Sequence, residues 1–339
     1  MRDARVVAPE VLLSILDRSR TRAGTPDSAA LTATIERAVH AEQLGYHRFW
    51  VAEHHGVPGI ASGSPPVLIA AIGAHTSRIR VGSGGVMVPN HQPLVVAEQF
   101  LMLEALYPGR IDLGLGRSLG FTEPVREALR RSKDEPDTFA DDIAELHSYL
   151  DGAGAVTARP RVRPRPPTFV LATGAGLDVA AAAGLPVVVG GPILHRADTV
   201  ELDHYRRTFR PTVANPVPYV VISLDILIAD SRIEARRLAL PEAWAMARSR
   251  RDGEFPQLES TDDIDESTWT PRVRERIERS LASSIHGTAT DVRTELDRIV
   301  ERTGADEVLA STSTYDRTAL FDADRALLAS YHQPVAAPI

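Results

Sequence analysis

A carboxylate and two imidazoles stand together in the chain at Glu53, His54 and His55, directly after an apolar run at 47–52. Such side chains can bind zinc or iron, can be satisfied structural groups, or can hold and move protons. Because neighbouring residues of an extended chain point to opposite sides, we do not expect the three to converge on a metal ion. We therefore predict no metal site and favour one imidazole that faces a ligand as a hydrogen-bond donor or proton carrier.

Two glycine-containing segments and one arginine follow other apolar runs. Gly84 and Gly85 let the backbone approach a flat ligand, although a tight turn is the commoner use of such a pair. Arg117 either meets an anion or lies on the surface. The segment Thr173-Gly174-Ala175-Gly176 leads into a predicted helix, whose free N–H groups favour a phosphate and equally suit a simple helix cap.

Short apolar runs alternate with amphipathic stretches along nearly the whole chain, which predicts repeated strand–helix units and a mainly parallel sheet. Eight strands are expected, at 11–16, 47–52, 78–82, 110–115, 168–172, 186–189, 219–229 and 307–310. Eightfold alternation in 339 residues favours a (β/α)8 TIM barrel over a doubly wound sheet. Active-site groups of such barrels project from the C-terminal strand ends, so the residues named above are expected around one mouth.

Helices are expected between these strands. One ends at Gly45, and others cover 67–74, 94–106, 177–183, 195–209, 233–247, 290–303 and 317–329. No helical pattern follows the glycine-rich stretch 116–120, so its similarity to a dinucleotide fingerprint is discounted. Two segments exceed a minimal barrel, namely a Pro/Arg-rich connector at about 152–167 and a polar stretch at about 248–271 that is typical of an insertion or lid. We predict one domain over 1–339.

Composition excludes several classes of protein. With 43% hydrophobic and 24% charged residues, the chain is typical of a folded globular protein. A net charge of −7 argues against nucleic acid as the main partner. The chain has no cysteine, which excludes disulfides, thiolate nucleophiles and cysteine-bound clusters. No apolar stretch suits a membrane span or a signal peptide, so a cytoplasmic protein without membrane contact is expected.

Four segments of the chain resemble the bacterial-luciferase-like flavin-dependent monooxygenases. They are FWVAEHH at 49–55, TSRIRVGSGGVMVPNH at 76–91, AEQ at 97–99 and PGRIDLGLGR at 108–117. The sequence is most similar to the short subgroup found in natural-product clusters, such as the cluster for mensacarcin. The resemblance implies a luciferase-like barrel that uses reduced FMN from a separate flavin reductase to activate O2 as a flavin C4a-peroxide and oxidise a small organic molecule. It also implies a homodimer.

The resemblance assigns roles by motif position. His54 corresponds to the imidazole beside the reacting edge of the flavin, and Glu53 to a group that supports its hydrogen bonding. Gly84-Gly85 corresponds to a peptide, often cis in the family, that lies against the flavin ring. The remaining implied cofactor contacts are Asn90 in the same stretch, the flavin-contacting Arg117, and Arg130 or Arg131 at the phosphate.

One departure from the family lies at Thr173-Gly174-Ala175-Gly176, where the resemblance leads us to expect a run of serines. Fewer hydroxyls at the phosphate imply weak FMN binding. Two alternatives therefore stay open: an F420- or flavin-dependent dehydrogenase on the same barrel, and a non-catalytic barrel that has lost its flavin. The identity of the substrate, and the choice between hydroxylation and Baeyer-Villiger insertion, do not follow from the sequence.

Overall fold

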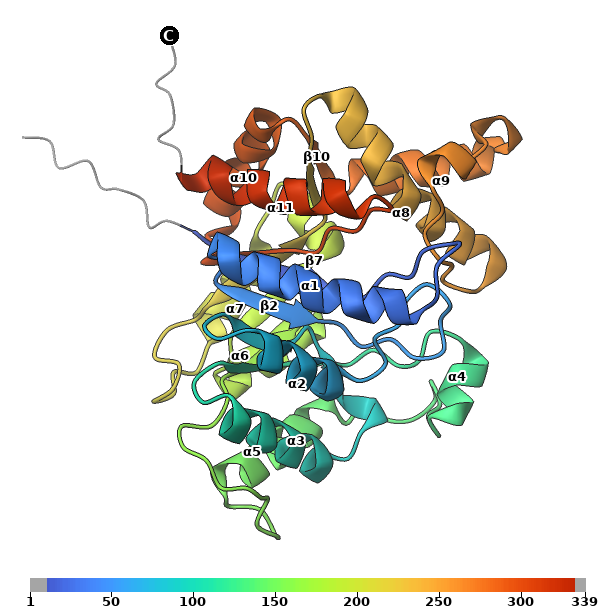
Figure 1. Cartoon of the computed structure of the whole chain (residues 1–339). Coiled ribbons are helices and arrows are strands. Elements are labelled where there is room, and N and C mark those ends of the chain that lie inside the picture. The colour runs from blue at the N-terminus through green and yellow to red at the C-terminus, as the bar shows by residue number, and fades with distance from the viewer. Residues whose placement is uncertain (1–10, 333–339) are drawn as a thin grey trace, which may run out of the picture.

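The computed structural model describes residues 11–332, which form a closed parallel barrel with helices around it (Figure 1). Eight strands pair in the order β3-β2-β1-β11-β8-β7-β6-β5, and β3 pairs with β5 to close the barrel. Their bounds are β1 Leu12–Asp17, β2 Arg48–Val51, β3 Arg80–Ser83, β5 Ile111–Gly116, β6 Thr168–Leu171, β7 Val187–Gly190, β8 Val220–Leu224 and β11 Glu307–Ala310. Each overlaps a predicted strand, so the predicted (β/α)8 TIM barrel is confirmed.

Three shorter strands complete the described sheets. β4, Val86–Met87, pairs with the end of β5, while β9, Ile226–Ile228, and β10, Ile285–Gly287, pair outside the barrel. The predicted strand at 219–229 is therefore two strands, β8 and β9, interrupted at Asp225. The carboxylate of Asp225 accepts hydrogen bonds from Arg18 and Ser311, and these hold the interruption at the barrel mouth.

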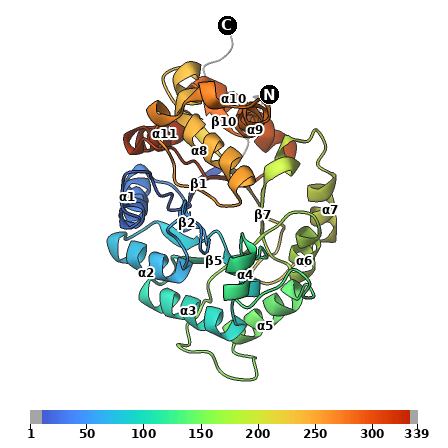
Figure 2. The same ribbon diagram turned by 90° about the vertical axis from the view of Figure 1, so that its right-hand side faces the viewer.

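Helices surround the barrel, as Figure 2 shows from the end toward which the strands point. The longer ones are α1 Ser28–Leu44, α2 Pro65–His75, α3 Pro93–Leu106, α5 Phe139–Asp151, α6 Ala175–Ala183, α7 Val200–Thr208, α8 Arg232–Asp252, α9 Pro271–Ala282, α10 Ala289–Thr303 and α11 Arg317–His332. α1 ends, as predicted, at Gly45, whose φ of 99° suits glycine. Between residues 11 and 332 no helix is long and apolar enough to cross a membrane.

Some helices differ from their predictions. The predicted helix 195–209 is a short 3-10 turn, η2 Gly191–His195, followed by α7. Helices α5 and α9 were not predicted. A short helix, α4 Glu123–Ala128, does follow the 116–120 stretch, so the expectation of no helix there is wrong. It buries no residue and therefore carries no apolar periodicity that would reveal it.

The barrel interior is filled in layers below its mouth. At the N-terminal end, Arg48 forms ion pairs with Asp112 at 2.9 Å and with Glu307 at 2.8 Å. An apolar layer lies next to it, built from Leu16, Trp50, Ala52, Phe169, Val188, Val221 and Leu309. Because strand residues alternate between inside and outside, each strand supplies only a few of these side chains. The barrel interior is therefore closed below the C-terminal mouth, where barrels of this kind bind their ligands.

The two extra segments have different structures. The connector 152–167 joins α5 to β6 and contains cis peptides before Pro160 and Pro164. The first residues of 248–271 complete α8, which is longer than predicted, and the rest runs through η3 Thr261–Asp263 and η4 Glu266–Thr268 to α9. The lid role of this segment and the single domain stay predictions, and residues 1–10 and 333–339 of that domain lie outside the described residues.

Candidate active site

Glu53, two residues beyond β2, is the centre of a hydrogen-bonded cluster. The residue is 2% exposed, and its Oε1 accepts hydrogen bonds from Nε2 of His55 and from Nε2 of His91, each at 2.8 Å. Its Oε2 accepts the backbone N–H of Met87 at 3.2 Å. Burial raises the pKa of Glu53, but the hydrogen bonds from His55 and His91 outweigh burial and hold the pKa below its ordinary value. Glu53 is therefore a carboxylate at neutral pH.

Glu53, His55 and His91 also form a set that could hold a metal ion. One ligand atom from each residue lies within 4.8 Å of the others. Two imidazoles and a carboxylate are ordinary ligands of divalent transition metals. Sequence reasoning missed His91, although it ends the matched stretch 76–91, because that reasoning compared only the adjacent residues 53–55. The absence of a metal site stays a prediction.

His54 lies beside this cluster but has a different environment. Its backbone N–H donates to the carbonyl oxygen of Ser62 at 2.9 Å, and its Nδ1 is buried without a hydrogen-bond partner among the described residues. Burial, together with the positive charges of Arg18 and Arg20, lowers the pKa of His54 to about 4. The imidazole is therefore neutral at pH 7, with one ring nitrogen available to a ligand.

Gly84 and Gly85 are buried between β3 and β4, and the peptide that joins them is cis, as expected. A Cβ atom on Gly84 would lie 2.5 Å from Cδ1 of Leu16, and one on Gly85 would lie 2.9 Å from the carbonyl oxygen of Gly114. No larger residue fits either position without a shift of its neighbours. Asn90 follows in η1, Val88–Asn90, and its Oδ1 is buried without a partner within the described part of the chain.

Arg117 leaves the barrel directly after β5. Its Nη1 donates to Oδ2 of Asp137 at 3.1 Å, and the two side chains are 40% and 64% exposed. Arg131 pairs with Glu135 at 3.2 Å, and Arg130 is exposed with a φ of 59°. The described contacts of Arg117 and Arg131 are thus with carboxylates of the same connecting segment, Asp137 and Glu135.

The N-terminus of α6 carries the segment predicted to hold a phosphate. Thr173, Gly174 and Ala175 are exposed, and Gly176 is buried. Gly174 has a φ of 55°, and a Cβ there would meet nothing within 4 Å, so backbone geometry rather than space calls for glycine. Together with the unpartnered Nδ1 of His54, this open helix end fits a flavin and its phosphate.

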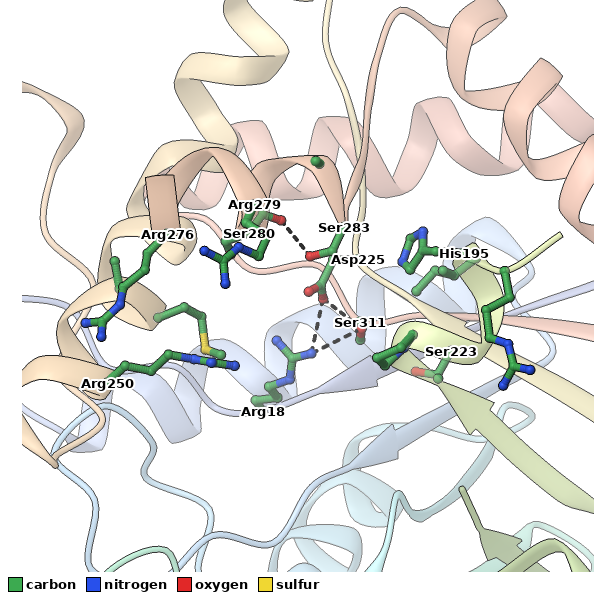
Figure 3. A pocket seen from close by; sticks show the side chains of 18 residues that line it. Arg18, His195, Ser223, Asp225, Arg250, Arg276, Arg279, Ser280, Ser283 and Ser311 are labelled. Atoms are coloured by element: carbon green, nitrogen blue, oxygen red, sulfur yellow. Dashed lines mark hydrogen bonds and ion pairs between the residues drawn. The ribbon is translucent and has the colours of Figure 1, made fainter. Parts of the chain in front are cut away.

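A cavity of about 780 Å³ opens at the same mouth, and Figure 3 shows the side chains that line it. Its floor contains Arg18 after β1, Asp225 after β8 and Ser311 after β11, which are joined by hydrogen bonds. Helices α8 and α9 supply one wall. Sequence reasoning missed this cavity because its residues are drawn from several elements that are distant in the chain. Arg18 is also one of the two arginines whose positive charges lower the pKa of His54.

A parallel eight-stranded barrel with a half-buried, neutral imidazole and a cis glycine pair at its mouth agrees with the luciferase-like barrel that the resemblance implied. Residues 10–307 match the family model described as "Luciferase-like monooxygenase". The chain belongs to the luciferase-like monooxygenase family, and it is an enzyme of the flavin-dependent monooxygenase class. The resemblance noted in the sequence is thereby confirmed.

Two curated relatives and one solved structure illustrate the similarity. A luciferase-like monooxygenase of Escherichia coli strain K12 is 36% identical over 317 residues, which cover 91% of this chain and 93% of the relative. N-acetyl-S-alkylcysteine monooxygenase of Bacillus subtilis is 39% identical over 173 residues, about half of each chain. The crystal structure of apo-MsnO8 is 33% identical, covers 95% of this chain and 98% of its own, and has a TM-score of 0.83.

More distant structures share the fold alone. One is the oxygenating constituent of 3,6-diketocamphane monooxygenase from Pseudomonas putida in complex with FMN, which is 16% identical with a TM-score of 0.70. Another is an F420-dependent secondary alcohol dehydrogenase with an F420-acetone adduct, 13% identical with a TM-score of 0.67. The barrel thus serves both kinds of cofactor in other proteins.

Proposed function

We propose that the protein is the oxygenase of a two-component system that uses FMNH2 and O2 to oxidise a small organic molecule. The observation that carries the proposal is the environment of His54, a neutral imidazole with a buried, unpartnered Nδ1. It follows β2, which pairs in register with β3 up to Val51 and Ser83, directly before the cis Gly84-Gly85 peptide. A proton-handling group and a flat backbone surface therefore follow the ends of two neighbouring strands.

Different residues are proposed to bind the cofactor and to transfer protons. Bound reduced FMN would supply the two electrons that activate O2. The cis peptide between Gly84 and Gly85 would lie against its flat ring, Arg117 would contact the flavin, and the open N-terminus of α6 would bind its phosphate. His54 holds or moves a proton at Nδ1. Overall, substrate, O2 and FMNH2 give oxygenated substrate, water and FMN, so one oxygen atom enters the product.

The substrate and the partners belong to the same proposal. The relative from Bacillus subtilis is named for N-acetyl-S-alkylcysteines. A thioether of that kind, N-acetyl-S-benzylcysteine, is therefore a reasonable first probe for this chain. A separate flavin reductase would supply FMNH2, and we propose a cytoplasmic homodimer.

Anaerobic calorimetric titration with photoreduced FMN tests the proposal. Reduced FMN is expected to bind more tightly than oxidised FMN, and a reaction with a flavin reductase, NADH and 18O2 is expected to place one labelled atom in the product. A parallel titration with F420 addresses the alternative. Binding of F420 with oxygen-independent substrate reduction would make the protein a dehydrogenase, and binding of neither cofactor would make it a non-catalytic barrel.

A further inference from the structure

The 780 Å³ cavity at the barrel mouth is lined by more basic than acidic side chains. Its lining includes five arginines and one carboxylate: Arg18, Arg196, Arg250, Arg276, Arg279 and Asp225. Figure 3 shows Arg18, Arg250, Arg276 and Arg279 on one side of the space, with His195 and Ser223 on the other. A cleft lined by one sign of charge concentrates ligands of the opposite sign.

Three of these arginines already have carboxylate partners. Arg18 pairs with Asp225 at 3.1 Å on the cavity floor. Arg279 pairs with Glu275 at 2.8 Å within α9. Arg196 forms ion pairs with Asp198 and Glu201, at 3.1 and 2.6 Å. The charges of these three guanidinium groups are therefore largely balanced within the protein.

Arg250 and Arg276 differ from the other three. Arg250 lies near the end of α8 and Arg276 in the middle of α9, and neither forms an ion pair with a carboxylate among the described side chains. The two helices pack against each other and present both guanidinium groups to one cavity. Two guanidinium groups without such partners on the lining of one cavity attract an anion to it.

The rest of the lining is mixed in polarity. Met246, Leu224 and Pro192 supply apolar surface, and Ser280 and Ser283 supply hydroxyl groups. A guanidinium fork matches the two oxygens of a carboxylate, and a bidentate pair of this kind is strong and directional. The cavity is large enough for a small organic molecule that carries such a group.

We propose that this cavity binds the substrate and that the substrate is an organic carboxylate, held at its acid group by Arg250 and Arg276 with its apolar part against Met246 and Leu224. The inference rests on the proposed function, since it names the substrate class of the same barrel mouth. It places the acid group at α8 and α9, away from the N-terminus of α6, where the flavin phosphate is proposed to bind.

Calorimetry with N-acetyl-S-benzylcysteine and its uncharged amide tests this inference without flavin. The acid is expected to bind at least about tenfold more tightly than the amide, as a charge-assisted hydrogen bond implies. Arg250→Gln and Arg276→Gln should each weaken binding of the acid about tenfold and leave binding of the amide unchanged. Arg272→Gln is the matched control, because this exposed arginine is on α9 but does not line the cavity. Circular dichroism and thermal melting confirm that each variant is folded.

Four results would overturn the inference. The acid and the amide could bind equally tightly. Both could fail to bind at millimolar concentration. The preference for the acid could also survive in both variants. Finally, the two variants could weaken FMN but not riboflavin, which would assign the arginines to the flavin phosphate. These titrations need no turnover, so they test the carboxylate site separately from the monooxygenase reaction. If the acid preference is absent but 18O still enters the product, only the carboxylate site is excluded. If the acid preference is present but no 18O enters the product, only the monooxygenase proposal fails.

Discussion

Glu53 and His91 are 38 residues apart in the chain, and Oε1 of Glu53 accepts a 2.8 Å hydrogen bond from Nε2 of His91. The same carboxylate accepts the N–H of Met87, so it fastens the end of β2 to the segment that follows the glycine pair. One buried charge thus orders the loop that carries Asn90, between Met87 and His91.

Glu53→Gln is expected to destabilise the protein by about 2 kcal/mol, because an amide cannot accept two imidazole N–H groups and a backbone N–H equally well. Urea unfolding measures the loss, and hydrogen exchange at the Met87 amide should accelerate. Glu127→Gln, an exposed and unpaired position among the described residues, is the control. Equal stability of the two variants would show that the cluster does not order this loop.

Acidification should weaken the fold through Glu53 as well. Its pKa is lower in the folded protein than in the unfolded chain, so the unfolded state takes up protons first as the pH falls. The stability contributed by Glu53 is present above the ordinary pKa of a glutamate and is lost as the pH falls through the folded value. In Glu53→Gln the loss of stability that comes from protonation of Glu53 should disappear from the pH dependence of urea unfolding. A pH profile equal to that of the unaltered protein would contradict this contribution of Glu53.

His54 is predicted to titrate near pH 4 rather than at the ordinary value of 6.5. Between these values the unfolded chain binds a proton that the folded chain does not, so stability falls as the pH is lowered through this window. NMR of the His54 ring protons measures the midpoint. Arg18→Gln removes a nearby positive charge and should raise the midpoint of the His54 titration, provided that circular dichroism shows an intact fold. A midpoint near 6.5 in the unaltered protein would contradict the burial of the imidazole.

The same residue has a catalytic test. His54→Asn should keep the fold and lower product formation by about a hundredfold or more if the imidazole moves a proton. His75→Asn, on the exposed end of α2, is the control. Normal turnover in His54→Asn would remove His54 from the proposed chemistry.

Arg117→Gln should raise the dissociation constant of reduced FMN about tenfold. The melting temperature should change little, because an exposed ion pair such as that with Asp137 contributes at most about 1 kcal/mol. Asp137→Asn is the matched control, since it frees Arg117 and should keep FMN binding equal or tighter. An unchanged dissociation constant in Arg117→Gln would exclude this contact with the cofactor.

Asp112→Asn should be strongly destabilising, by about 3–5 kcal/mol, because it leaves the buried Arg48 without one of its two partners. Asp112 also accepts the indole N–H of Trp50 at 3.1 Å, so Trp50 fluorescence and urea unfolding both report the change. The exposed Asp134→Asn is expected to have no effect. A loss below about 1 kcal/mol would show that the polar layer contributes little.

Local patterns in the sequence were sufficient for the barrel. The apolar run at 307–310 coincides with β11, and Gly45 ends α1 as predicted, because strand burial and the left-handed helix end both depend on neighbouring residues. The placement of Glu53, His54 and Gly84 at strand ends followed in the same way, since barrel topology assigns the C-terminal ends to one mouth. The cis peptide was expected only from the family resemblance.

Only the tertiary structure decided which side chains from distant parts of the chain lie close together. In sequence, Arg250 and Arg276 are like the arginines of any solvated helix face, and the turn at Asp225 lies inside one long apolar run. Only closure of the barrel brings Asp225 to Arg18, and only packing of α8 on α9 places Arg250 and Arg276 around one cavity. Periodicity reports the local path of the backbone, whereas contacts between distant residues depend on how the elements pack.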